Sequence, residues 1–109
     1  MTAVEVARAF GLADDSAIYR SVGSTEANAI ASRVLQIGMA HGSEIMSASR
    51  AADLWQQFRA LFDGQELEFA SNTGTLPNSW NPATPATFDT GVLVMGTTKA
   101  GCFWVEEED

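Results

Sequence analysis

Two short apolar runs near the end of the chain decide its fold, and a Gly-rich link separates them. They read Val92-Leu93-Val94-Met95, then Gly96-Thr97-Thr98-Lys99-Ala100-Gly101, then Cys102-Phe103-Trp104-Val105. β-Branched and aromatic runs on either side of such a link are typical of a β-hairpin. Because both arms are apolar at every position, we expect the hairpin to be covered on both faces. We expect a helical layer over one face and a Pro-rich loop over the other.

That loop occupies residues 72–87, which hold all three prolines amid Ser, Thr, Asn and Gly. Long irregular loops are uncommon in compact domains and are often functional. Just before it, Glu66-Leu67-Glu68-Phe69 alternates acidic and apolar residues. This alternation predicts a strand with one wet face.

The N-terminal half shows helical periodicity. The strongest pattern runs from Ser47 to Phe62, with apolar residues at Ala51, Leu54, Trp55, Phe58, Leu61 and Phe62. A second helix is expected over residues 24–41, with Ser24 as its cap and an apolar stripe at Ile30, Val34 and Ile37.

A third, shorter helix is expected from Thr2 to Phe10, although a strand is the alternative for this segment. Thr2 and Glu5 fit a capping box, and Gly11 fits the helix end. Because helices come first and strands last, the sequence predicts an α+β fold, with N-terminal helices packed on a small C-terminal antiparallel sheet. A length of 109 residues fits a single domain, 1–109.

The charge balance excludes some functions. Six Lys and Arg against fourteen Asp and Glu give a net charge of −8, and four of these acids are the last four residues. A field of this sign repels phosphate, so direct nucleic-acid binding is not expected. The sequence has one cysteine, no secretory signal and no long apolar run. We therefore expect a cytoplasmic protein that does not enter a membrane.

Catalytic and metal-binding residues are sparse. A single His41 and a single Cys102 cannot build a closed zinc site, and no Gly-rich phosphate loop is present, so we expect no metal and no cofactor. His41 with Cys102 is the one pair that suggests nucleophilic catalysis. The alternative is that both residues are structural, with His41 at a helix end and Cys102 as a small buried hydrophobe.

The acidic residues are the better candidates for a site. Glu66 and Glu68 point to one side of their strand, Asp89 precedes the hairpin, and the tail follows it. If the strands pair, these acids gather along one rim that would attract a basic partner. The residues expected at this rim are Glu66, Glu68, Asp89, Glu106, Glu107, Glu108 and Asp109. The alternative is a solvated tail that only improves solubility.

Trp80, in the middle of the Pro-rich loop, extends this hypothesis. Tryptophan is enriched among the residues that dominate interface energies, so Trp80 is a candidate anchor for a partner. The alternative is that Trp80 forms a lid over the second face of the sheet.

The C-terminal run adds a resemblance. Residues 88–96 read Phe-Asp-Thr-Gly-Val-Leu-Val-Met-Gly, and the chain closes with Cys-Phe-Trp-Val-Glu-Glu-Glu-Asp. This ending resembles that of small bacterial immunity proteins, which neutralise toxins of type VI secretion, contact-dependent inhibition and related systems. The resemblance covers about the last fifth of the chain and carries over no individual functional residue. It implies a small, acidic, non-enzymatic protein that binds its toxin directly.

We therefore expect an immunity protein that inhibits a basic toxin domain through an acidic surface. One alternative is an anti-CRISPR or other DNA-mimicking inhibitor, whose carboxylates stand in for phosphates at intervals of ~6–7 Å. A second alternative is a small enzyme that uses His41 and Cys102.

Overall fold

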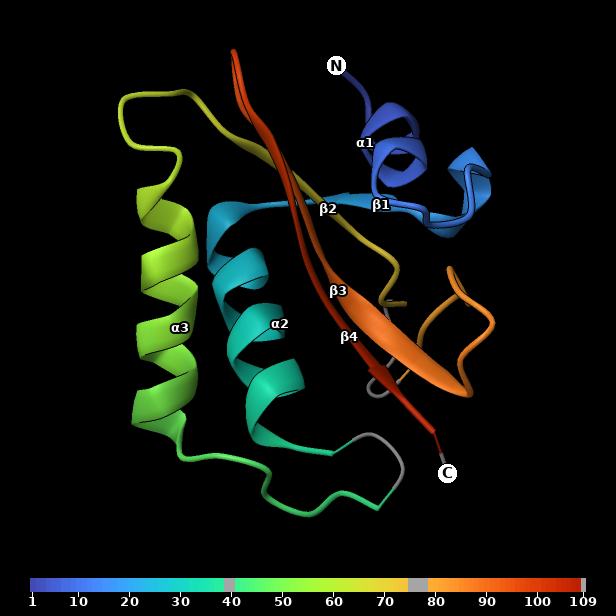
Figure 1. Cartoon of the computed structure of the whole chain (residues 1–109), viewed down its shortest axis with the longest axis vertical. Helices are drawn as coiled ribbons and strands as arrows, with labels where there is room; N and C mark the ends of the chain where they lie inside the picture. The colour runs from blue at the N-terminus through green and yellow to red at the C-terminus, as the bar shows by residue number, and fades with distance from the viewer. Residues whose placement is uncertain (39–40, 75–78, 109) are drawn as a thin grey trace.

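The computed structural model describes residues 1–38, 41–74 and 79–108, which form a four-stranded antiparallel sheet with helices on both faces (Figure 1). The strands lie in the order β1 (Arg20–Val22), β2 (Glu68–Ser71), β3 (Phe88–Met95) and β4 (Ala100–Glu107). Helices α2 (Ser24–Gln36) and α3 (Ala48–Ala60) lie on one side of the sheet, and α1 (Ala3–Ala9) lies on the other. The predicted α+β class is confirmed.

The predicted hairpin is present and longer than its apolar runs. β3 and β4 pair over eight positions, from Phe88 opposite Glu107 to Met95 opposite Ala100. All of β3 after Phe88 is buried, as expected. β4 is different, because it is the edge strand and most of its residues are only half-buried.

Helices α2 and α3 bury the first face of the sheet. The ring of Trp55 lies 5.0 Å from that of Phe103 on β4 and stacks on Phe58 at 5.6 Å. Trp55 and Phe62 are almost fully buried, and burial of side chains of this size stabilises the fold by about 1.5–3 kcal/mol each. Leu61, predicted to share this buried stripe, is instead 60% exposed, because it lies past the last helical residue on the flank of α3.

Helix α2 is shorter than predicted. It begins after Gly23, which caps it without a side-chain hydrogen bond, so Ser24 is its first residue and not its cap. It ends at Gln36, because Ile37 is extended and pairs with Glu44. The predicted continuation to His41 is wrong, and His41 lies exposed in the turn that follows.

The second face is covered by α1 together with part of the Pro-rich loop that we expected there, because Ala83 is buried and its carbonyl accepts from the N–H of Ala13 at 2.8 Å. Thr2 caps this helix by accepting a hydrogen bond from the Glu5 N–H at 3.2 Å, as predicted. Val6 and Ala7 are buried and pack in one cluster with Leu93 of β3. Phe10 lies beyond the helix and is 51% exposed.

β1 was not predicted, because its three residues are too few to show an alternation. It pairs with β2, which begins at Glu68 and not at Glu66 as predicted. Within the described ranges, none of the helices has the length and hydropathy needed to cross a bilayer.

Candidate interaction surface

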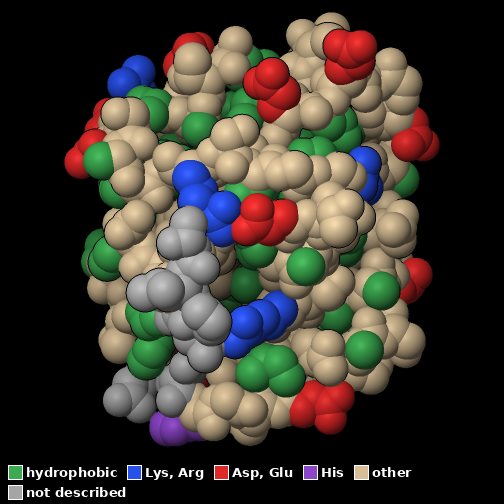
Figure 2. Space-filling model, turned by 180° about the vertical axis from the view of Figure 1, so that it is seen from behind, with side chains coloured by type: hydrophobic (Ala, Val, Ile, Leu, Met, Phe, Trp, Pro, Cys, Tyr) green, Lys and Arg blue, Asp and Glu red, His purple; other side chains and the backbone are tan. Residues whose placement is uncertain are grey.

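The structure separates the acids that we expected along one rim. Glu68 lies opposite Met95 at one end of β3, whereas Glu106 lies opposite Asp89 near the other end. Six residue steps along a strand correspond to about 20 Å. Glu66 precedes β2 by two residues and is exposed, as is Glu68. The prediction of a single acidic rim is therefore wrong, and the tail acids stand apart from Glu66 and Glu68. On the face shown in Figure 2, acidic side chains are likewise scattered singly.

Asp89 is a second correction, because its carboxylate is fully buried and not available to a partner. It accepts hydrogen bonds from the backbone N–H groups of Ala83 and Thr84, at 3.1 and 3.3 Å, and from the Thr84 hydroxyl at 3.2 Å. The amide of Asn72 and the indole of Trp104 also donate to it. A buried charge needs such partners, so Asp89 serves to fasten residues 83–84 to the sheet.

Asn72 completes this buried polar cluster. Its amide nitrogen donates to the carbonyls of Asn81 and Asp89, at 2.8 and 2.9 Å, and its amide oxygen accepts from the Thr90 hydroxyl at 3.0 Å. Both ends of the Pro-rich loop are therefore fixed to β3 by side chains.

The tail acids are held in place by the sheet. Glu106 and Glu107 belong to β4, paired with Asp89 and Phe88. The carboxylate of Glu108 accepts hydrogen bonds from the N–H and the hydroxyl of Thr87, at 3.3 and 2.6 Å. Three acids therefore have defined backbone positions, and two of them, Glu106 and Glu108, remain exposed to solvent. Asp109 lies outside the described residues.

Trp80 lies at this same end of the sheet. Its ring is tilted over that of Phe88, with 5.4 Å between the centroids, and the side chain is half-buried. Because side chains alternate along β3, Phe88 shares the face of Val92, which lies under α2 and α3. The predicted lid over the second face is therefore wrong, since the Trp80 ring packs on Phe88 of the first face.

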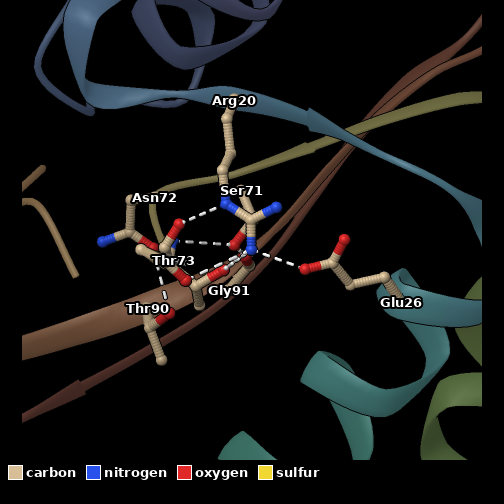
Figure 3. A network of polar contacts seen from close by, with 8 residues as sticks. Arg20, Glu26, Ser71, Asn72, Thr73, Thr90 and Gly91 are labelled. Atoms are coloured by element: carbon tan, nitrogen blue, oxygen red, sulfur yellow. Dashed lines mark hydrogen bonds and ion pairs between the residues drawn. The ribbon is translucent and has the colours of Figure 1, made fainter. Parts of the chain in front are cut away.

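Arg20 holds the chain segment that supports Trp80 (Figure 3). From β1 it donates to the Thr73 carbonyl at 2.6 Å and to the Thr73 hydroxyl and the Gly74 carbonyl at 3.1 and 3.3 Å. Thr73 in turn pairs with Trp80. The carboxylate of Glu26 accepts from Arg20 at 2.5 Å, and this hydrogen bond lowers the pKa of Glu26.

We name this group of residues the acidic end: Trp80, Phe88, Glu106, Glu107 and Glu108. The ladder puts Glu107 directly opposite Phe88, on the face of the sheet that carries the two aromatic rings, whereas Glu106 lies opposite Asp89 and points to the other face. The two rings and the three carboxylates therefore share one end of the sheet. Sequence analysis identified Trp80 and the three glutamates but missed Phe88. The apolar residues that follow Phe88 on the hairpin arm were the signal that could have identified it.

Cys102 and His41 do not form a catalytic pair in this fold. Cys102 faces α1, in a cluster with Tyr19 and Trp104, whereas His41 follows α2 on the opposite face of the sheet. Burial raises the pKa of the Cys102 thiol to about 11, which disfavours the nucleophilic thiolate. Among residues 1–38, 41–74 and 79–108, no three His, Cys, Asp or Glu side chains are grouped so as to hold a metal ion.

Comparison with known protein families, with curated proteins and with solved structures finds no match to this chain. The similarity of its C-terminal run to immunity proteins thus stays a prediction.

Proposed function

We propose that this protein is a non-enzymatic inhibitor whose acidic end binds the basic surface of a partner protein, as an immunity protein binds its toxin. The observation that carries the proposal is the fixed placement of Glu106, Glu107 and Glu108 at the same end of the sheet as the Trp80–Phe88 pair. Carboxylates on a protein surface attract a basic partner and speed its association.

Rigidity supports this assignment. Ordering a side chain on binding costs about 0.5–1.5 kcal/mol, and a tail held by the sheet has already lost part of that freedom. The half-buried ring of Trp80 adds an apolar anchor of the kind that concentrates binding energy. Charge supplies the attraction and the aromatic pair supplies a place to dock.

The arrangement favours a basic protein surface over a DNA mimic. A mimic needs a row of carboxylates at phosphate spacing. On the side of β4 that carries Glu106, the preceding positions are Trp104 and Cys102, which are uncharged. The row is therefore too short to imitate a nucleic-acid strand.

The immunity function is tested by growth protection. The gene immediately upstream is expressed alone and together with this protein, and we expect growth arrest in the first case and growth in the second. Replacing Glu106, Glu107 and Glu108 with Gln is expected to abolish protection. The matched control replaces Glu5, Glu66 and Glu68 with Gln, which removes the same charge from exposed positions elsewhere and should preserve protection.

Circular dichroism verifies that both triple variants fold. A harmless upstream product would contradict the immunity function. Equal loss of protection in the two triple variants would show that overall charge matters and that the acidic end does not.

A further inference from the structure

We propose that a second copy of this chain pairs with the outer edge of β4, so that two sheets join into one across a two-fold axis. In the part of the chain that the structure describes, β4 is the last strand of the sheet and pairs only with β3. Residues 100–105 contain no proline, lysine or arginine. These are the residues with which proteins usually protect an exposed edge strand from pairing.

The backbone of β4 is set up for such pairing. The N–H of Gly96 donates to the carbonyl of Lys99 at 2.8 Å, which fixes the alternation of the hairpin ladder. By that alternation, the backbone groups of Cys102, Trp104 and Glu106 point away from β3. Each of these residues presents a donor and an acceptor along the free edge.

An apolar flank lies beside this edge. Phe58 of α3 packs on Phe103 of β4, and Arg59 of α3 donates to Asn28 of α2. Helical spacing then places residues 54 and 61, seven apart, on the flank of α3 that faces away from α2. Both are leucines; Leu54 is half-buried and Leu61 is 60% exposed. Two-fold pairing of β4 brings the same flank of each copy together over the joined strands.

Charge selects the antiparallel arrangement. β4 follows Lys99 and ends in Glu107. In a pair centred on Phe103, Lys99 of each copy lies opposite Glu107 of the other, whereas a parallel pair would bring the two acidic ends together. Lys99 and Glu107 are eight residues apart along one strand, about 26 Å, so they cannot reach each other within one copy.

Sedimentation equilibrium over a wide concentration range tests the proposal. We expect the wild type to approach twice the chain mass of 11.6 kDa. Leu61→Gln should weaken the dimer about tenfold, because it removes an exposed apolar contact. Phe10→Gln is the matched control: Phe10 is 51% exposed but lies at the end of α1, and its replacement should leave the dimer unchanged.

A charge swap gives a second readout. Lys99→Glu alone should weaken the dimer, and Glu107→Lys in the same chain should restore it, since the pair forms between copies. A wild type that stays at 11.6 kDa would overturn the proposal, even if the edge then accepted a strand from another protein. A dimer that Phe10→Gln weakens as much as Leu61→Gln, or that the charge swap does not rescue, would also overturn it.

Discussion

Trp104 donates a hydrogen bond from its indole Nε1 to Oδ1 of Asp89 over 3.2 Å, and so joins the edge strand to a carboxylate that solvent does not reach. The two residues lie on the same face of the sheet, two positions apart in the ladder, because Trp104 pairs with Gly91. The acidic end begins directly beyond this contact, so its geometry depends on how well Asp89 is held.

Replacing Asp89 with Asn is expected to lower the free energy of unfolding by about 2–3 kcal/mol, because an amide loses charge-assisted hydrogen bonds and turns a donor toward buried N–H groups. Urea denaturation measures the change. Asp63→Asn, at an exposed acid after α3, is the control and should have little effect. Equal stability of Asp89→Asn and wild type would mean that the buried carboxylate does not fasten the loop.

Gly91 is required by the close approach of Trp104. A Cβ atom at Gly91 would lie 2.7 Å from the Trp104 Cα and 2.8 Å from its ring, with backbone atoms that cannot move aside. Gly91→Ala should therefore lower the free energy of unfolding by about 2 kcal/mol or more. The control, Gly23→Ala, meets no atom within 4 Å and should cost about 1 kcal/mol or less. Thermal unfolding distinguishes the two, and similar melting temperatures would contradict this account of Gly91.

Stability is expected to fall at alkaline pH. Burial raises the pKa of Cys102 from 9.0 to about 11, and burial together with Asp89 raises that of Tyr19 from 10.0 to about 12. Both groups are neutral in the folded state when the unfolded chain has begun to ionise. Their contribution to the free energy of unfolding is complete below pH 9 and is lost as the pH rises toward 12.

Urea unfolding at a series of pH values from 8 to 11 checks this prediction. Cys102→Ala should make the decline shallower, because one of the two ionising groups is gone. A decline that is the same with and without the thiol would show that Cys102 is not held in its neutral form.

The hairpin and α3 could be predicted because their signals are local. Apolar runs on either side of a Gly-rich link specify a hairpin, and the spacing of Ala51, Trp55 and Phe58 specifies a buried helix face. The end of α2 could not be predicted, because the apolar stripe continues to Ile37. The chain leaves the helix there to pair with Glu44, which is a contact between residues seven apart.

The candidate site was predictable in part. The glutamates and Trp80 stood out by residue type, and their proximity follows from the register of β3 and β4. The burial of Asp89 depends on Asn72, Thr84 and Trp104, which lie five to seventeen residues away in the sequence. The separation of Glu68 from the tail depends on the order of the strands, which the alternation pattern does not report.

The most direct test of the central claim is an NMR titration of the labelled protein with lysozyme, a basic protein, at low salt. We predict that the largest amide shifts fall on residues 87–88 and 106–108 and on the Trp80 indole. These shifts should disappear when Glu106, Glu107 and Glu108 are replaced with Gln. They should persist when Glu5, Glu66 and Glu68 are replaced with Gln. Shifts spread over all acidic positions, or equal loss in both triple variants, would contradict a binding surface at the acidic end.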